Sequence, residues 1–108
     1  MPPRGRRKER IMALYEHIVE IKTVDECFRF FEDLCAPTEL QAMEQRFNVA
    51  KMLHDGKVYT AILSETGASS ATVSRVNRAL NYNTGGMKEI MERVDEKNGI
   101  APAKEDEE

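Results

Sequence analysis

No run of eighteen apolar residues occurs in this 108-residue sequence, so no segment is predicted to cross a membrane as a helix. Only two cysteines are present, Cys27 and Cys35. They lack C-x-x-C spacing and a histidine at ligand spacing, which favours reduced thiols in a cytoplasmic protein over a metal site. The basic N-terminus is followed by no unbroken apolar stretch, so no signal peptide is expected.

The residue patterns of common active sites are also missing. Ser69, Ser70 and Ser74 have no histidine near them in the sequence that could act as a general base. The glycine pair at 85–86 follows no strand pattern, which argues against a glycine-rich phosphate loop. We therefore expect no enzyme, no metal site and no required cofactor.

Charge is plentiful but is segregated to the two ends of the chain. The net charge is −3, yet residues 1–10 hold five basic side chains and one acid, while the last five residues hold four acids and one lysine. We expect a basic, disordered arm over 1–10 that can meet phosphates, one domain over 11–97, and an acidic, disordered tail over 98–108. A solvated end that only aids solubility is the alternative for both, and it is favoured for the tail.

The apolar residues follow a helical period through the first half of the chain. One stripe consists of Ile11, Leu14, Ile18 and Ile21. Thr23 and Glu26 form a capping box that predicts the start of a second helix. Pro37 suits the first position of a third helix, and Gly56 suits the position after its end.

Shorter helices are predicted in the second half. They cover 59–66, 70–80 and 87–94, with a break at 67–69. No period-two strand pattern is found, so the fold class is all-α with about six helices. Phe28, Phe30 and Phe31 point in different directions around the second helix, and a helix that is apolar on more than one side is usually buried on more than one side. In so short a chain a second copy could cover it, so we expect a homodimer.

Residues 67–76, GASSATVSRV, stand where the second helix of a helix-turn-helix would begin, within a unit spanning about 59–80. Gly67 falls at the turn, and the positions that must be apolar are Ile62, Ala68, Val73 and Val76. Small hydroxylated side chains let such a helix approach the major groove, and arginines bind phosphate or guanine. The outer face has no acid, and Ser69 can cap the helix. The predicted DNA-binding residues are Ser69, Ser70, Ala71, Thr72, Ser74, Arg75 and Arg78.

The stretch 36–82, with its T-G-x-S-x-x-T-V-S-R sequence, resembles the DNA-binding half of the tryptophan repressor superfamily, and the whole chain resembles its YerC/YecD-type branch. The resemblance covers the third to fifth helices well and the first two by pattern and length. It implies an intertwined, all-helical homodimer that binds double-stranded DNA in successive major grooves. It also implies a bacterial transcriptional regulator with a Trp repressor-like fold.

The same resemblance suggests an effector site. In the tryptophan repressor two arginines hold the indole and the carboxylate, and the matching residues are Arg46 and Arg75. The next residue is glycine in that repressor and Val76 here, so the branched side chain should fill part of the space. Arg46, Arg75 and Val76 are thus candidates for binding a small planar or anionic effector, and L-tryptophan is not expected to bind well.

Simpler interpretations stand beside these assignments. Arg46 could be a surface arginine paired with Glu39 or Glu44, and Val76 could be a core residue only. His17 and His54 are expected on helix surfaces. Together the patterns predict a cytoplasmic, repressor-like, sequence-specific DNA-binding protein with no membrane contact.

Two rival functions stay open. One is a dimeric helical adaptor that binds protein, against which the acid-free face argues. The other is a DNA-binding protein with a role like that of replication initiators, against which the short length and the missing ATP-binding motif argue.

Overall fold

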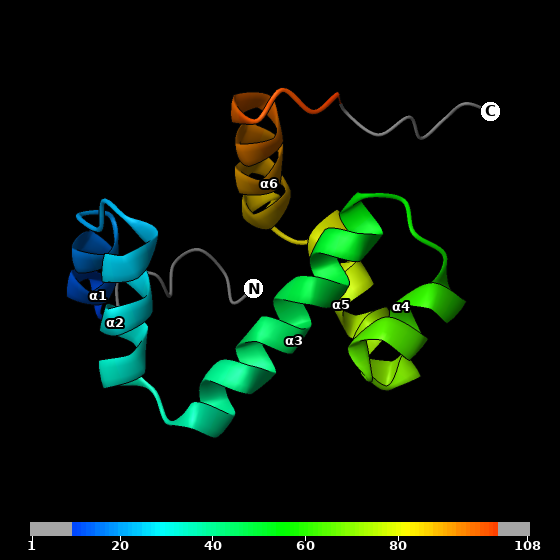
Figure 1. The fold of residues 1–108 in the computed structure, drawn as a ribbon, viewed down its shortest axis with the longest axis horizontal. Helices are drawn as coiled ribbons and strands as arrows, with labels where there is room; N and C mark the ends of the chain where they lie inside the picture. The colour runs from blue at the N-terminus through cyan, green and yellow to red at the C-terminus, as the bar shows by residue number, and fades with distance from the viewer. Residues whose placement is uncertain (1–9, 102–108) are drawn as a thin grey trace. The chain divides into compact units, whose positions relative to one another are not determined.

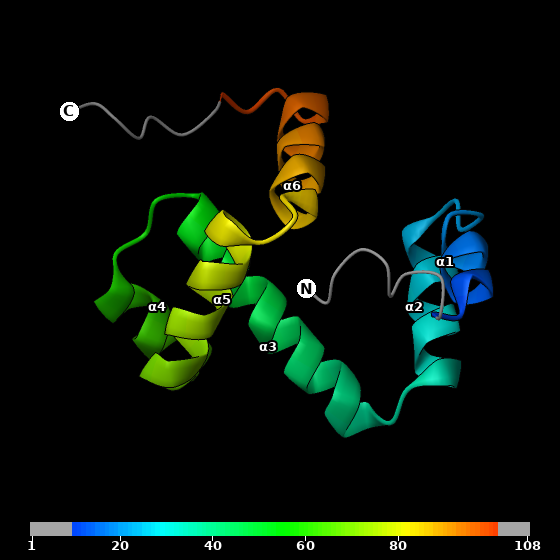
Figure 2. The same cartoon turned by 180° about the vertical axis from the view of Figure 1, so that it is seen from behind.

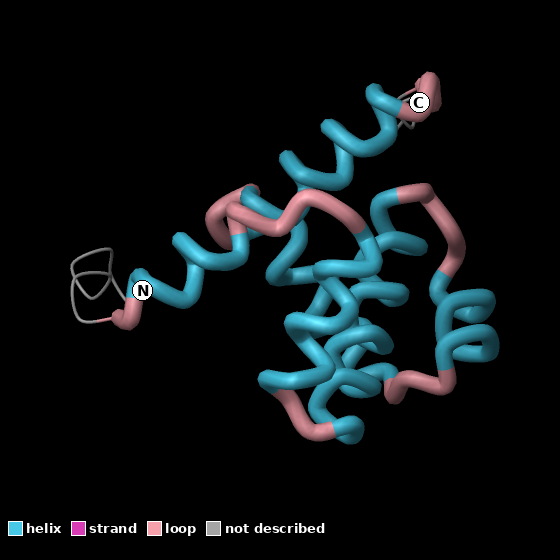
Figure 3. The backbone as a smooth tube through the Cα atoms, turned by 60° about the vertical axis from the view of Figure 1, so that its left-hand side comes forward, coloured by secondary structure: helices cyan, strands magenta, loops and turns pink. Residues whose placement is uncertain are grey.

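The computed structural model describes residues 10–101 and contains helices but no strand within that range (Figure 1, Figure 3). The helices are α1 (Met12–Ile18), α2 (Val24–Leu34), α3 (Pro37–His54), α4 (Tyr59–Thr66), α5 (Ser70–Tyr82) and α6 (Gly86–Lys97). The predicted all-α class with about six helices is confirmed. None of the described helices is long and apolar enough to span a bilayer. The expected arm and tail lie mostly outside the described residues.

The chain divides into two compact units, one ending at Leu40 and the other beginning at Gln41, and each is described by itself. In the first unit the predicted capping box is present. The Thr23 hydroxyl accepts the Glu26 amide at 3.1 Å, and the Glu26 carboxylate accepts the Lys22 amide at 2.9 Å. These bonds satisfy two backbone donors at the start of α2, which fixes where the helix begins.

The first unit has little core of its own. No residue of α1 or α2 is fully buried, although Phe30 and Phe31 stack edge to face with ring centroids 5.3 Å apart. Its large exposed apolar side chains, here called the exposed apolar set, are Ile11, Met12, Tyr15, Val19, Val24, Phe28 and Leu34. A short unit with this much apolar surface in contact with water is poorly stabilised unless something covers it.

The second unit has one apolar core, to which α3, α4, α5 and α6 each contribute residues. Figure 1 and Figure 2 show α4 and α5 beside the C-terminal part of α3. The buried residues are Val49, Ala50, Ile62, Ala68, Val73, Val76, Leu80 and Met91. The four positions predicted to be apolar for a helix-turn-helix all belong to this core, so that prediction is confirmed. Because α4 and α5 share the core with the C-terminal half of α3, their positions within the unit are fixed by packing.

Two helices are longer than predicted. α5 continues to Tyr82, and α6 runs from Gly86 to Lys97 rather than over 87–94. Gly85 precedes α6 with a φ of 85°, a left-handed conformation that glycine adopts at no steric cost. The turn beyond α6 closes with a 2.8 Å hydrogen bond from the Ile100 amide to the Asp95 carbonyl.

Candidate nucleic-acid interface

The start of α5, the second helix of the helix-turn-helix, is set by a short turn with well-defined hydrogen bonds. Gly67 has a φ of 73°, and its amide donates to the Leu63 carbonyl at 3.1 Å. The Ala68 amide donates to the Thr66 hydroxyl at 3.1 Å. Ser69 then caps α5, because its hydroxyl accepts the Thr72 amide at 3.1 Å. The predicted turn at Gly67 and the predicted cap of α5 by Ser69 are therefore confirmed.

The outward face of α5 is the one that the sequence predicted. Its exposed residues include Ser69, Ser70, Ala71, Ser74, Arg75 and Arg78. Thr72 is partly buried, and its hydroxyl accepts from that of Ser69 at 3.1 Å. Six of the seven predicted DNA-binding residues are thus exposed, and Thr72 is partly accessible.

This face carries positive charge that no acid among residues 10–101 pairs with. α5 contains no aspartate or glutamate, and no ion pair among residues 10–101 involves Arg75 or Arg78. Lys88, in the first turn of α6, donates to the Asn81 side chain at 3.2 Å and so adds a third cation beside the helix. A cationic surface next to small side chains suits a polyanion that must come close to the backbone.

The three candidate effector residues differ in their surroundings. Arg46 on α3 is exposed, and the ion pair with Glu39 or Glu44 is not found among the described residues. Instead, Glu39 accepts the Ala36 amide at 2.7 Å. Arg75 is exposed on α5, whereas Val76 is only 8% exposed and packs in the core. The interpretation of Val76 as a core residue is confirmed.

The expectation that His54 lies on a helix surface was wrong. Its side chain is 10% exposed, and its Nε2 lies 3.1 Å from a carboxylate oxygen of Asp95, which is 11% exposed. The Lys51 ammonium lies 2.9 Å from Asp55 and 3.8 Å from Asp95. Hydrogen bonding to Asp55 raises the pKa of Lys51, so this lysine stays charged at neutral pH. The four side chains attach α6 to the end of α3.

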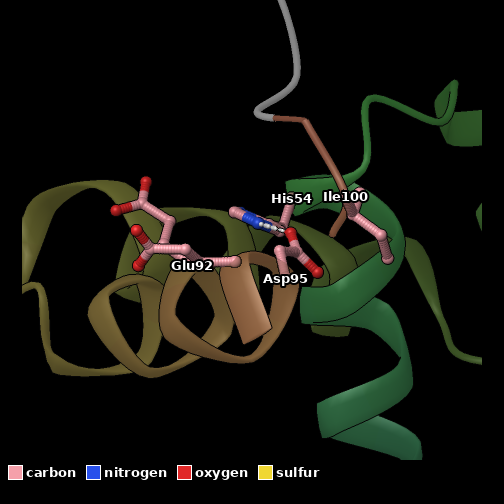
Figure 4. A pocket seen from close by; sticks show the side chains of 5 residues that line it. His54, Glu92, Asp95 and Ile100 are labelled. Atoms are coloured by element: carbon pink, nitrogen blue, oxygen red, sulfur yellow. Dashed lines mark hydrogen bonds and ion pairs between the residues drawn. The ribbon is translucent and has the colours of Figure 1, made fainter. Parts of the chain in front are cut away.

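A cavity of about 370 Å³ lies beside this cluster and is lined by His54, Glu92, Asp95, Glu96 and Ile100 (Figure 4). None of the candidate effector residues lines it. His54, Asp55 and Asp95 also bring possible ligand atoms within 4.8 Å of one another, an arrangement that can hold a metal ion. Lys51 already places a positive charge between the two carboxylates, so the cluster is explained as a structural ion-pair network.

Within residues 10–101 the helices α4 and α5, joined by a glycine turn, have the arrangement of a helix-turn-helix, a motif typical of DNA-binding proteins. The family model described as "Trp repressor protein" matches residues 9–95. The chain therefore belongs to the Trp repressor family.

Individual relatives agree with this assignment. The uncharacterized Bacillus subtilis protein YerC is 44% identical over 90 residues, covering 83% of this chain and 86% of YerC. A TrpR-like protein from Eubacterium eligens matches in structure with a TM-score of 0.74 and 44% identity, covering 82% of this chain and 94% of that one. A Staphylococcus aureus crystal structure with the provisional name Trp repressor gives a TM-score of 0.75 and 39% identity, covering 83% and 93%.

Proposed function

We propose that this protein is a sequence-specific DNA-binding transcriptional regulator that acts as a homodimer, in the manner of a repressor. The observation that carries the proposal is the exposed, acid-free face of α5, which begins at a fixed turn on a fold of the Trp repressor family. In this proposal α5 enters the major groove with its N-terminus first. The positive end of the helix then faces the phosphates.

The proposed contacts are of two kinds: contacts to base edges, which recognise the sequence, and contacts to phosphates, which position the protein on the DNA. Arg75 and Arg78 are long enough to reach guanine edges or phosphates, and Ser70 and Ser74 offer hydroxyls at the approaching face. The basic arm over 1–10 adds affinity for any DNA sequence by neutralising phosphates. All but its last residue lies outside the described residues, so its contribution is proposed from charge alone.

The proposal of a homodimer is supported by the exposed apolar set of the first unit. Covering these side chains removes apolar surface from water, which is the main driving force of obligate association. A two-fold dimer presents two copies of α5, so each would meet one half of a near-palindromic site.

Selection of bound DNA from a random duplex library tests the function directly. We expect enrichment of a near-palindrome whose half-site centres lie about one helical turn apart, roughly 10 base pairs. Affinity for the selected site should fall steeply as salt rises, because phosphate contacts release counterions. Recovery of no common sequence, together with salt-independent behaviour, would favour the adaptor function instead.

We also propose that any effector site at Arg46 and Arg75 does not bind L-tryptophan well and that DNA binding does not need it. Val76 is buried against the core, so its branched side chain has little freedom to move away. Overpacking such a site costs about 1–3 kcal/mol, which weakens binding by roughly one to two decades. The arginine pair still suits a small planar or anionic ligand.

Calorimetry with L-tryptophan tests this prediction. The wild-type dimer should release little or no heat, and a gain of binding is expected in Val76→Gly. Val76→Ala is a useful companion because it removes the branch while keeping helix propensity, which glycine lowers by about 1 kcal/mol. Tight binding by the wild-type protein would contradict the steric argument, and binding by neither variant would show that more than Val76 closes the site.

A further inference from the structure

One side-chain hydrogen bond connects α3 directly to the helix-turn-helix turn. The Gln45 amide nitrogen donates to the Thr66 carbonyl at 3.1 Å, across 21 positions of sequence. Thr66 is the last residue of α4, so its carbonyl belongs to the group that a helix leaves without an intrahelical partner. Gln45 supplies the missing donor from a different helix, and the bond is partly buried.

Thr66 occupies the centre of the hydrogen bonding that shapes the turn. Its hydroxyl donates to the Ile62 carbonyl at 2.7 Å and accepts the Ala68 amide at 3.1 Å. Gly67 follows Thr66 in the left-handed conformation, and Ser69 caps α5 two residues later. The direction in which α5 leaves the turn therefore depends on how the peptide group of Thr66 is oriented.

We propose that Gln45 is a positioning residue for DNA recognition: by fixing the Thr66 carbonyl, it sets the angle at which α5 leaves the turn. The inference rests on the proposed DNA-binding function. Apolar packing holds α4 and α5 together but permits small rotations, whereas a directional hydrogen bond selects one orientation. Recognition of bases depends on that orientation because hydrogen bonds to base edges are geometrically specific. Electrostatic attraction to phosphates depends on it much less.

The test compares Gln45→Met with Gln41→Met. Methionine approximates the size of glutamine, removes the donor and leaves the net charge unchanged, so electrostatic attraction to DNA is preserved. Gln41 is an exposed residue one turn earlier on α3, and no hydrogen bond is seen for its side chain among the described residues. It controls for the change of glutamine to methionine on this helix.

The readout is the ratio of affinity for the selected site to affinity for unrelated DNA. We expect Gln45→Met to lower this ratio by roughly tenfold, the change that corresponds to the loss of one partly buried hydrogen bond. Gln41→Met should leave the ratio unchanged. Equal ratios in the two variants, or a proportional loss of both affinities in Gln45→Met, would overturn the positioning role, since a merely structural defect lowers both together.

Amide hydrogen exchange separates this inference from the proposed function. If Gln45 fixes the turn, the amides of Gly67 and Ala68 should exchange faster in Gln45→Met than in Gln41→Met, with or without DNA. Equal exchange rates would overturn the inference. A wild-type protein that prefers no DNA sequence would overturn the proposed function, while faster exchange in Gln45→Met would still establish the connection between α3 and the turn.

Discussion

Replacing Phe28 with Asp is expected to give a monomeric or unfolded chain, although the residue is 53% exposed in the single chain. In a protein that functions as a monomer, a change at so exposed a position usually alters the free energy of unfolding by about 0.5 kcal/mol or less. In the proposed dimer Phe28 is covered by the partner, and losing a buried phenyl group alone costs about 3–5 kcal/mol. Burying an unpaired carboxylate adds to that cost.

Both subunits carry the change, so the dimer dissociation constant should rise by roughly three orders of magnitude or more. Sedimentation at micromolar concentration measures the association, and circular dichroism measures the helix content. Thr38→Asp is the matched control, because it adds the same charge at an exposed polar position near the start of α3. A wild-type monomer, or a Phe28→Asp dimer as tight as the wild type, would contradict the homodimer.

Replacing Arg75 or Arg78 with Ala should weaken binding to the selected DNA while leaving the fold intact. Both side chains are exposed and free of ion pairs among the described residues, so little stability depends on them. Loss of a bidentate base contact costs about 1–3 kcal/mol, roughly five- to 150-fold in affinity. An arginine that meets phosphate instead should lower the slope of log affinity against log salt by about one.

Fluorescence anisotropy over a range of salt concentrations separates the two roles. Arg93→Ala is the control, since this arginine is exposed on α6 and its guanidinium lies 3.2 Å from Glu89. It should change neither affinity nor selectivity. Wild-type affinity in both the Arg75 and the Arg78 variant would show that α5 is not the recognition helix.

The sequence by itself determined the features that depend on neighbouring residues. The Thr23–Glu26 cap and the cap of α5 by Ser69 are hydrogen bonds between residues three positions apart. The left-handed turn at Gly67 depends on that glycine itself. The spacing of the helix-turn-helix motif similarly predicted that Ile62, Val73 and Val76 are buried, because the motif needs apolar residues there to hold its two helices together. The exposed, acid-free face of α5 followed from the same spacing, as the residues that the motif does not bury.

Only the tertiary structure decided the contacts between distant segments. His54 meets Asp95 across 41 positions, and Gln45 meets Thr66 across 21. Nothing near either residue in the sequence indicates its partner, and His54 was therefore placed wrongly on the surface. Periodicity tells which side of a helix is buried but not which residue of another helix lies opposite, because that depends on how the helices pack around the common core.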